Sequence, residues 1–195
     1  MSQKLSLCVL LLGVLSLNTP ALAQEHSHSS SSHDSHSDHD ASDSNATHGT
    51  PSAHVHGEAH LTMAVDVQSL VMELEVPLDS LVGFEHKPTN DTETKALAQA
   101  HDLLAKADAL FKLNEAAECI LTSAEIDMPS FEAGAHADVD AEYQYQCDAP
   151  ERISSLEVSL FQSFERIEVL KTIYLSDDKQ LAATLTPDNT AFALR

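Results

Sequence analysis

The feature that most constrains the fold is a change of composition near Pro51. Before it, residues 24–53 are rich in serine, histidine and aspartate and have almost no apolar side chains to bury. Such a segment cannot offset the entropy of ordering its backbone, so we expect a disordered arm. After it, apolar patterning continues to the end of the chain. We therefore expect one folded domain over residues 54–195, long enough for a single core.

The first residues have the composition of an export signal. Lys4 precedes an apolar run over residues 5–17, and the small residues Ala21 and Ala23 follow. This order is typical of a secretory signal peptide, here over residues 1–23, and the run is too short to span a membrane. We expect a periplasmic protein with no membrane span.

The formal net charge of the chain is −21, from 31 acidic and 10 basic residues. A field of this sign repels nucleic acid and anionic membranes and concentrates cations near the surface. The charge therefore argues against a nucleic-acid partner and in favour of a positively charged one.

Apolar and polar residues alternate over residues 61–67 and again over 70–76, which predicts two strands joined by a turn. Later segments also have β-branched and aromatic residues between turn residues. The further strands expected are 119–128, 135–147, 153–160, 167–175, 181–186 and an end around Phe192. Strands that do not alternate with helices indicate the α+β class with a largely antiparallel sheet.

One main helix is expected, over about residues 92–113. Apolar residues recur there at helical spacing, from Leu97 to Phe111, and charged residues occupy the other face. Either Asp91 or Thr92 could cap its N-terminus.

Histidine dominates the arm. The neutral imidazole is the commonest metal-binding side chain in proteins, which makes the arm a candidate for loose, exchangeable metal binding. The candidate ligands in the arm are His26, His28, His33, His36, His39 and His48. Imidazole with a few carboxylates suits zinc first, and copper or nickel are the alternatives.

A second group of candidate ligands alternates along the motif HVHGEAH. His54, His56, Glu58 and His60 occupy every second position. If this segment begins the first strand, the four side chains share one face, and two or three could converge on one ion. The alternative is polar decoration of an exposed edge strand.

Three further residues are candidate ligands. His86 follows Glu85 in a turn between the second strand and the helix, and His136 and Asp138 stand two apart near the start of a later strand. Each could equally be an ordinary surface residue. His101 is mid-helix with no other histidine or cysteine at helical spacing, so we do not assign it to a site.

Cys119 and Cys147 remain after removal of the signal peptide. In an oxidising compartment we expect a disulfide between them, and a pair of thiolate zinc ligands is the alternative. The motifs HExxH and GxSxG are missing from the sequence, and HVHGEAH departs from the HxHxDH pattern of metallo-β-lactamase-type hydrolases. A zinc-dependent hydrolase is thus disfavoured, and we do not expect an enzyme.

Four short motifs together resemble the ZrgA-type zinc-uptake family. They are HVHGEAHL at 54–61, PLDSLVGFEH at 77–86, AAEC at 116–119, and AHAD at 135–138 followed by YQC at 145–147. The resemblance implies a secreted zinc-binding protein that supports zinc acquisition alongside an ABC zinc importer or its solute-binding protein. It also favours the histidines of HVHGEAH, His86, His136 and Asp138 as ordered ligands. A buffer against excess metal would need the same ligands and stays open.

Overall fold

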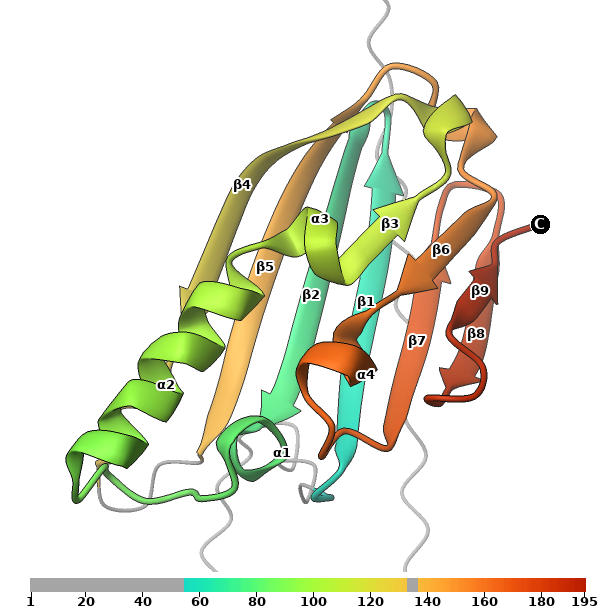
Figure 1. Ribbon diagram of the computed structural model, residues 1–195. Coiled ribbons are helices and arrows are strands. Elements are labelled where there is room, and N and C mark those ends of the chain that lie inside the picture. Colours follow the sequence, from blue (N-terminus) through green and yellow to red (C-terminus); the bar gives the residue numbers. More distant parts are fainter. Residues whose placement is uncertain (1–54, 133–136) are drawn as a thin grey trace, which may run out of the picture. The chain divides into compact units, whose positions relative to one another are not determined.

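The computed structural model describes residues 55–132 and 137–195. A six-stranded sheet has the order β4-β5-β2-β1-β7-β8. A second sheet of three strands, β3-β6-β9, lies together with the helices on one face of the six-stranded sheet (Figure 1). The strands are β1 (Glu58–Asp66), β2 (Ser69–Pro77), β3 (Phe111–Leu113), β4 (Cys119–Asp127), β5 (Asp138–Cys147), β6 (Ser155–Val158), β7 (Val169–Leu175), β8 (Gln180–Leu185) and β9 (Ala191–Ala193). The helices are α1 (Leu78–Val82), α2 (Asp91–Leu104), α3 (Ala107–Leu110) and α4 (Leu160–Ser163), with 3-10 turns at Glu115–Ala117 and Pro150–Arg152. The fold is α+β, as predicted.

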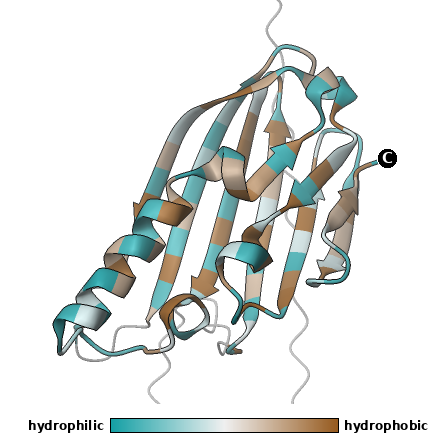
Figure 2. Cartoon of the chain, viewed as in Figure 1, coloured by the Kyte–Doolittle hydropathy of each residue, from teal (hydrophilic) through white to brown (hydrophobic). Residues whose placement is uncertain are grey.

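The predicted hairpin at the start of the domain is confirmed as β1 and β2, which pair antiparallel. Leu61 and Met63 on β1 and Leu70 and Met72 on β2 are at most 1% exposed. Figure 2 shows the resulting alternation of hydrophobic and hydrophilic residues along the strands. One face of the sheet is therefore the core, and the other, which we call the open face, carries the polar side chains.

One strand pairing is parallel. β1 pairs with β7 in parallel, and every other pairing in the described part of the chain is antiparallel. The expectation of a largely antiparallel sheet is thus confirmed with one exception, which makes the sheet mixed. The carbonyl of Gly57 starts the parallel pair by accepting hydrogen bonds from the backbone N–H groups of Glu168 and Val169.

The main helix is shorter than the predicted 92–113, because α2 ends at Leu104. The buried hydroxyl of Tyr143 donates to the carbonyl of Leu104 over 3.1 Å and satisfies one of the last carbonyl groups of the helix. Residues 107–110 form α3, and Phe111 then pairs with β6. Ala107 and Phe111 still face the core, so their spacing continued the helical pattern and concealed the break.

The N-cap of α2 is Asn90 and not Asp91 or Thr92. The Asn90 side chain accepts from the backbone N–H groups of Thr92 and Glu93, both at 3.0 Å. The Glu93 carboxylate accepts in return from the backbone of Thr89 at 2.7 Å. This reciprocal arrangement resembles a capping box and fixes where the helix begins.

The later strands agree with the prediction apart from their ends. The strand expected at 153–160 is β6, Ser155–Val158, followed by the short helix α4. The strand expected at 135–147 is β5, described from Asp138 onward. The helix α1 and the strand β3 were not predicted, since they have only 5 and 3 residues and too few positions to show a period.

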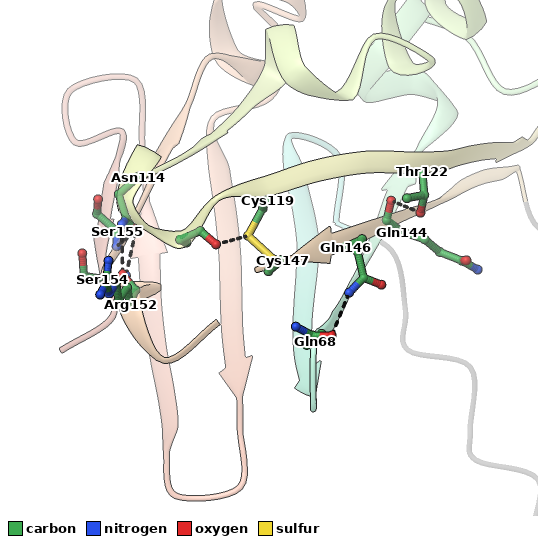
Figure 3. Close-up of a disulfide and its surroundings, with 11 residues drawn as sticks. Gln68, Asn114, Cys119, Thr122, Gln144, Gln146, Cys147, Arg152, Ser154 and Ser155 are labelled. Carbon is green, nitrogen blue, oxygen red and sulfur yellow. Dashed lines mark hydrogen bonds between the residues drawn. A yellow bond between two sulfur atoms is a disulfide. The ribbon is translucent and has the colours of Figure 1, made fainter. Parts of the chain in front are cut away.

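Cys119 and Cys147 lie opposite each other on β4 and β5, and a disulfide joins them (Figure 3). The predicted disulfide is confirmed, and neither sulfur is available as a thiolate zinc ligand. The same end of the molecule is secured by Asn114, whose side chain accepts from the backbone N–H of Ser154 at 2.7 Å and donates to the carbonyl of Arg152 at 2.9 Å (Figure 3).

The predicted signal peptide, 1–23, and arm, 24–53, lie outside the described residues, and so do His54 and His136. In the part that is described, every helix is too short or too polar to pass through a membrane.

Candidate metal centre

Gly57 divides the motif HVHGEAH into two parts. Its φ angle of 83° lies in the left-handed region that favours glycine, and β1 begins only at the next residue, Glu58. The Gly57 N–H donates to the Ser80 hydroxyl over 2.8 Å, which ties this turn to α1. The expected alternation of ligands on one face therefore applies to Glu58 and His60, while His56 precedes the strand.

Glu58 and His60 lie together on the open face. The His60 Nε2 is 3.1 Å from a carboxylate oxygen of Glu58, and the same oxygen pairs with the ammonium of Lys171 on β7. The hydrogen bond from Lys171 is the main cause that lowers the pKa of Glu58 below its usual value. A metal ion that bound Glu58 would have to compete with Lys171 for this carboxylate.

His56 contacts two carboxylates at the end of the sheet where β1 begins. Its Nε2 lies 3.0 Å from a carboxylate oxygen of Glu85, and its Nδ1 lies 3.7 Å from Oδ2 of Asp79 on α1. The His56 side chain is 59% exposed, so solvent ions can reach it. Imidazole and carboxylate are a donor pair that zinc accepts.

Arg166 occupies one side of this cluster. Its Nη2 is 2.9 Å and 3.2 Å from the two carboxylate oxygens of Asp79, and its Nε donates to the Asp79 carbonyl over 2.9 Å. The guanidinium thus neutralises Asp79 and places a positive charge near His56. Of the two carboxylates, Glu85 is the one that remains available for a metal ion.

His86 follows Glu85 directly and lies at the same end of the domain. Its Nδ1 is 3.0 Å from the carbonyl of Lys87, and its ring stacks on Phe84 with the centroids 5.2 Å apart. When Nδ1 carries the proton and donates to this carbonyl, Nε2 of the neutral ring keeps its lone pair. His86 is therefore oriented as a nitrogen ligand on an exposed loop.

Asp138 belongs to the same end of the sheet. It opens β5 and pairs with Pro77, the last residue of β2, directly before α1. The neighbouring Ala137 carbonyl accepts from the N–H of Leu78 over 2.7 Å. His136, two positions before Asp138, lies outside the described residues. Its role as a ligand stays a prediction, as do those of His54 and the histidines of the arm.

The ligands proposed from the sequence are thus separated in space. Glu58 and His60 form one pair on the open face, and His56 with Glu85 forms another beside α1. Over 55–132 and 137–195, no three His, Cys, Asp or Glu side chains are grouped so that they could hold a metal ion. A complete zinc site therefore requires side chains to move or ligands from outside these ranges.

The open face concentrates negative charge beside His60. A hollow of about 500 Å³ is lined by carboxylates of three neighbouring strands. Across the strands, Asp127 pairs with Asp140 and Asp140 with Glu75, which in turn pairs with His60. A second row joins Glu125, Glu142 and Glu73. Desolvation, and then the charges of Glu75, Asp138, Asp127 and Glu73, raise the pKa of Asp140.

Two residues in the cluster around His56 had little signal in the sequence. Asp79 was an ordinary acidic residue after Pro77, and Arg166, 87 positions away, had no pattern that linked it to a histidine. Glu85 was recognisable only by its position beside His86. The one usable signal was Gly57 inside a run of alternating ligands, since glycine there predicts an interruption of the strand.

Comparison with known protein families gives one match over most of the chain. The family described as ZrgA family zinc uptake protein matches residues 53–194. The matched segment includes the alternating histidines, the loop with Glu85 and His86, and the cysteines Cys119 and Cys147. No curated protein matches the chain.

Proposed function

Because this chain belongs to the ZrgA family of zinc uptake proteins, we propose that it captures zinc outside the cytoplasm and passes it to a high-affinity zinc importer or to the solute-binding component of one. The description of the family as zinc uptake proteins supports transport rather than catalysis, with zinc as the cargo. The periplasmic location rests on the composition of residues 1–23.

The observation that carries this proposal is the approach of His56 to Glu85 within 3.0 Å, with His86 as the next residue. Two imidazoles and a carboxylate make a donor set that fits zinc. All three side chains are exposed, at 59%, 37% and 57% respectively, so an ion can enter from solvent and leave again. Such access suits a protein that must release its cargo.

The acidic rows of the open face support capture. Six carboxylates on β4, β5 and β2 surround one hollow, and His60 lies at its edge. A surface of this charge raises the local concentration of divalent cations and the rate at which they arrive. We propose that zinc is attracted to this face, bound loosely by the histidines of residues 24–53, and held more firmly by His56, Glu85 and His86.

Calorimetric titration of zinc into the untagged mature chain tests the ordered site. His56→Ala should weaken the tightest binding step by about tenfold or more. His101→Ala is the matched control, because His101 lies on α2, 3.6 Å from Asp102, and is not part of the candidate site, so its loss should leave the binding unchanged. Equal affinity of the two variants would rule out His56 as a ligand.

A second titration tests the arm. A chain that lacks residues 24–53 should bind fewer ions in total, while its tightest step stays as in the full mature chain. If both chains bind the same number of ions, the arm has no part in capture. Acidification should weaken both kinds of binding, because an imidazole binds a metal ion only in its neutral form.

A further inference from the structure

Two strand edges border one groove on the covered side of the main sheet. Within the described residues, β4 is an edge of the six-stranded sheet and β3 is an edge of the three-stranded sheet. A groove of about 740 Å³ is lined by residues of both strands and by Tyr145 of β5. Figure 1 shows β3 and β4 diverging from the turn at Glu115–Ala117. The edge of β4 is thus positioned to pair with a further strand.

The walls of this groove are partly apolar. Phe111, Leu113, Ile120 and Leu121 contribute to its lining. Ile120 is 70% exposed, although it lies within a strand and next to a disulfide. A large apolar side chain at this position would be covered if another chain lay along the edge of β4.

Both walls are held in place by contacts within the domain. The disulfide from Cys119 to Cys147 fixes the first residue of β4 (Figure 3). Asn114 fixes the segment after β3 through its hydrogen bonds to Arg152 and Ser154. A groove whose walls are already ordered binds a peptide at a smaller entropic cost.

A β-bulge limits the length of edge that is available. The register between β4 and β5 shifts between Leu121 and Ser123, and the hydroxyl of Thr122 donates to the carbonyl of Gln144 over 2.9 Å at this point. Bulges interrupt strand addition. Only residues 119–121, which also line the groove, therefore form a regular edge on that side of the bulge.

The charged residues of the groove select the sign of the partner. Asp108, Glu115 and Glu118 are acidic, and Lys112 is the one basic residue among those that line it. An acidic segment would be repelled here and by the whole chain, with its net charge of −21. A segment with lysine or arginine side chains is complementary.

We propose that the edge of β4 binds an extended, basic segment of a partner protein, which lies along this groove as an additional strand with apolar side chains beside the exposed Ile120. This mode is β-strand addition, in which backbone hydrogen bonds provide affinity and side-chain pockets provide specificity. The site does not depend on zinc. It lies at the end of the sheet where the Cys147 N–H donates to Gln68 in the turn between β1 and β2, opposite to the end where β1 begins after His56.

The test uses an acetylated, amidated peptide of alternating lysine and valine as the probe and the disulfide-bonded mature chain as the target. Amide chemical shifts should change over residues 111–121. Methylating alternate backbone nitrogens of the peptide removes N–H donors without altering its side chains, and one of the two methylated forms should bind about tenfold more weakly than the parent. A peptide with glutamate in place of lysine should show no binding.

Ile120→Lys should weaken binding of the lysine–valine peptide by about tenfold, because apolar contact is lost and a positive charge is added. Val67→Lys is the matched control, because Val67 is 79% exposed and does not line the groove. The Val67→Lys chain should bind the peptide as tightly as the parent chain does. Both positions are exposed, so both variants should fold.

Three results would overturn the proposal. They are equal affinity of the Ile120→Lys and Val67→Lys chains, shift changes confined to the acidic hollow beside His60, and full binding by both methylated peptides. A parent chain that is dimeric in solution and becomes monomeric on Ile120→Lys would identify a second copy as the occupant and would also overturn it.

Discussion

The Nε2 atom of His56 lies 3.0 Å from a carboxylate oxygen of Glu85, although 29 positions separate the two residues. The contact depends on two turns of unusual backbone geometry. Gly57, with φ of 83°, interrupts the chain before β1, and Gly83, with φ of 86°, ends α1 and directs the chain into the loop with Glu85. The candidate site is therefore formed by backbone conformation at two glycines.

Gly57→Ala should destabilise both the domain and the candidate site. An L-residue held in the left-handed region costs about 1–2 kcal/mol. A Cβ atom would lie 3.4 Å from the carbonyl oxygen of Arg166, an ordinary van der Waals contact, so the cost comes from the backbone conformation. We expect the free energy of unfolding to fall by about 1–2 kcal/mol, measured by urea denaturation, with weaker zinc binding. Unchanged stability would mean that the turn tolerates a side chain.

Arg166→Met should raise zinc affinity while lowering stability. The guanidinium pairs with Asp79, whose Oδ2 lies 3.7 Å from Nδ1 of His56. Its removal takes a positive charge away from the site and frees a carboxylate for an ion, but it costs about 1 kcal/mol, the upper end for a pair whose guanidinium is 56% exposed. Zinc titration and urea denaturation measure the two effects.

Arg166→Lys separates the charge from the hydrogen bonds. Lysine keeps the positive charge but has one nitrogen, whereas the guanidinium uses Nη2 on the carboxylate and Nε on the carbonyl of Asp79, so lysine cannot keep both contacts. Its zinc affinity should stay near that of the parent chain while its stability falls. If the lysine variant gained as much zinc affinity as the methionine variant, the charge of Arg166 would not be what weakens the site.

The parts of the fold that were predictable are those in which local patterning and tertiary packing agree. The alternation over residues 61–67 and 70–76 arises because every second side chain of β1 and β2 is buried, and in both strands these side chains lie on the core face of the sheet. The disulfide was predictable from the cysteine count and an expected oxidising compartment. The end of α2 at Leu104 was not predictable, because the buried Ala107 and Phe111 keep the helical spacing beyond it. Phe111 nevertheless lies on β3 and pairs with Val158 of β6, far away in sequence.

The candidate site was predictable only in its components. His56, Glu58 and His60 were identified as a set by their spacing, and Gly57 then directed His56 toward α1, away from the other two. The contacts of Asp79 and Lys171 with these residues depend on the order of the strands. Sequence periodicity carries no information on which strands become neighbours.

Asp140→Asn should stabilise the domain at neutral pH. Asp140 faces Asp127 and Glu75 on the neighbouring strands, and directly opposed like charges destabilise a sheet. We expect a gain of about 0.2–1 kcal/mol in the free energy of unfolding, partly lost in high salt. Asp66→Asn is the matched control, because Asp66 faces Ser69 and its change should have little effect.

The gain should depend on pH in a defined direction. Burial and neighbouring carboxylates raise the pKa of Asp140 in the folded protein above its usual value of 3.8. Between the two values the folded state binds more protons than the unfolded state, so the contribution of this group to stability rises as pH falls through the folded pKa. The advantage of the Asp140→Asn variant over the parent chain should therefore shrink on acidification. An advantage that grew at low pH would contradict this assignment.

Removal of the disulfide should cost more than any of these changes. The bond between Cys119 and Cys147 closes a loop with a sequence separation of 28, for which loss of the constraint on the unfolded chain costs about 3–4 kcal/mol. The double change to alanine suits the site, because Cys147 is fully buried and a serine there would bring a hydroxyl group into the core. Urea denaturation of the double variant and of the reduced parent chain should give similar losses. The double variant should bind as many zinc ions as the parent chain, because the sulfur atoms are not ligands. A loss below about 1 kcal/mol in the free energy of unfolding would show that the pairing of β4 with β5 is strong enough without the bond.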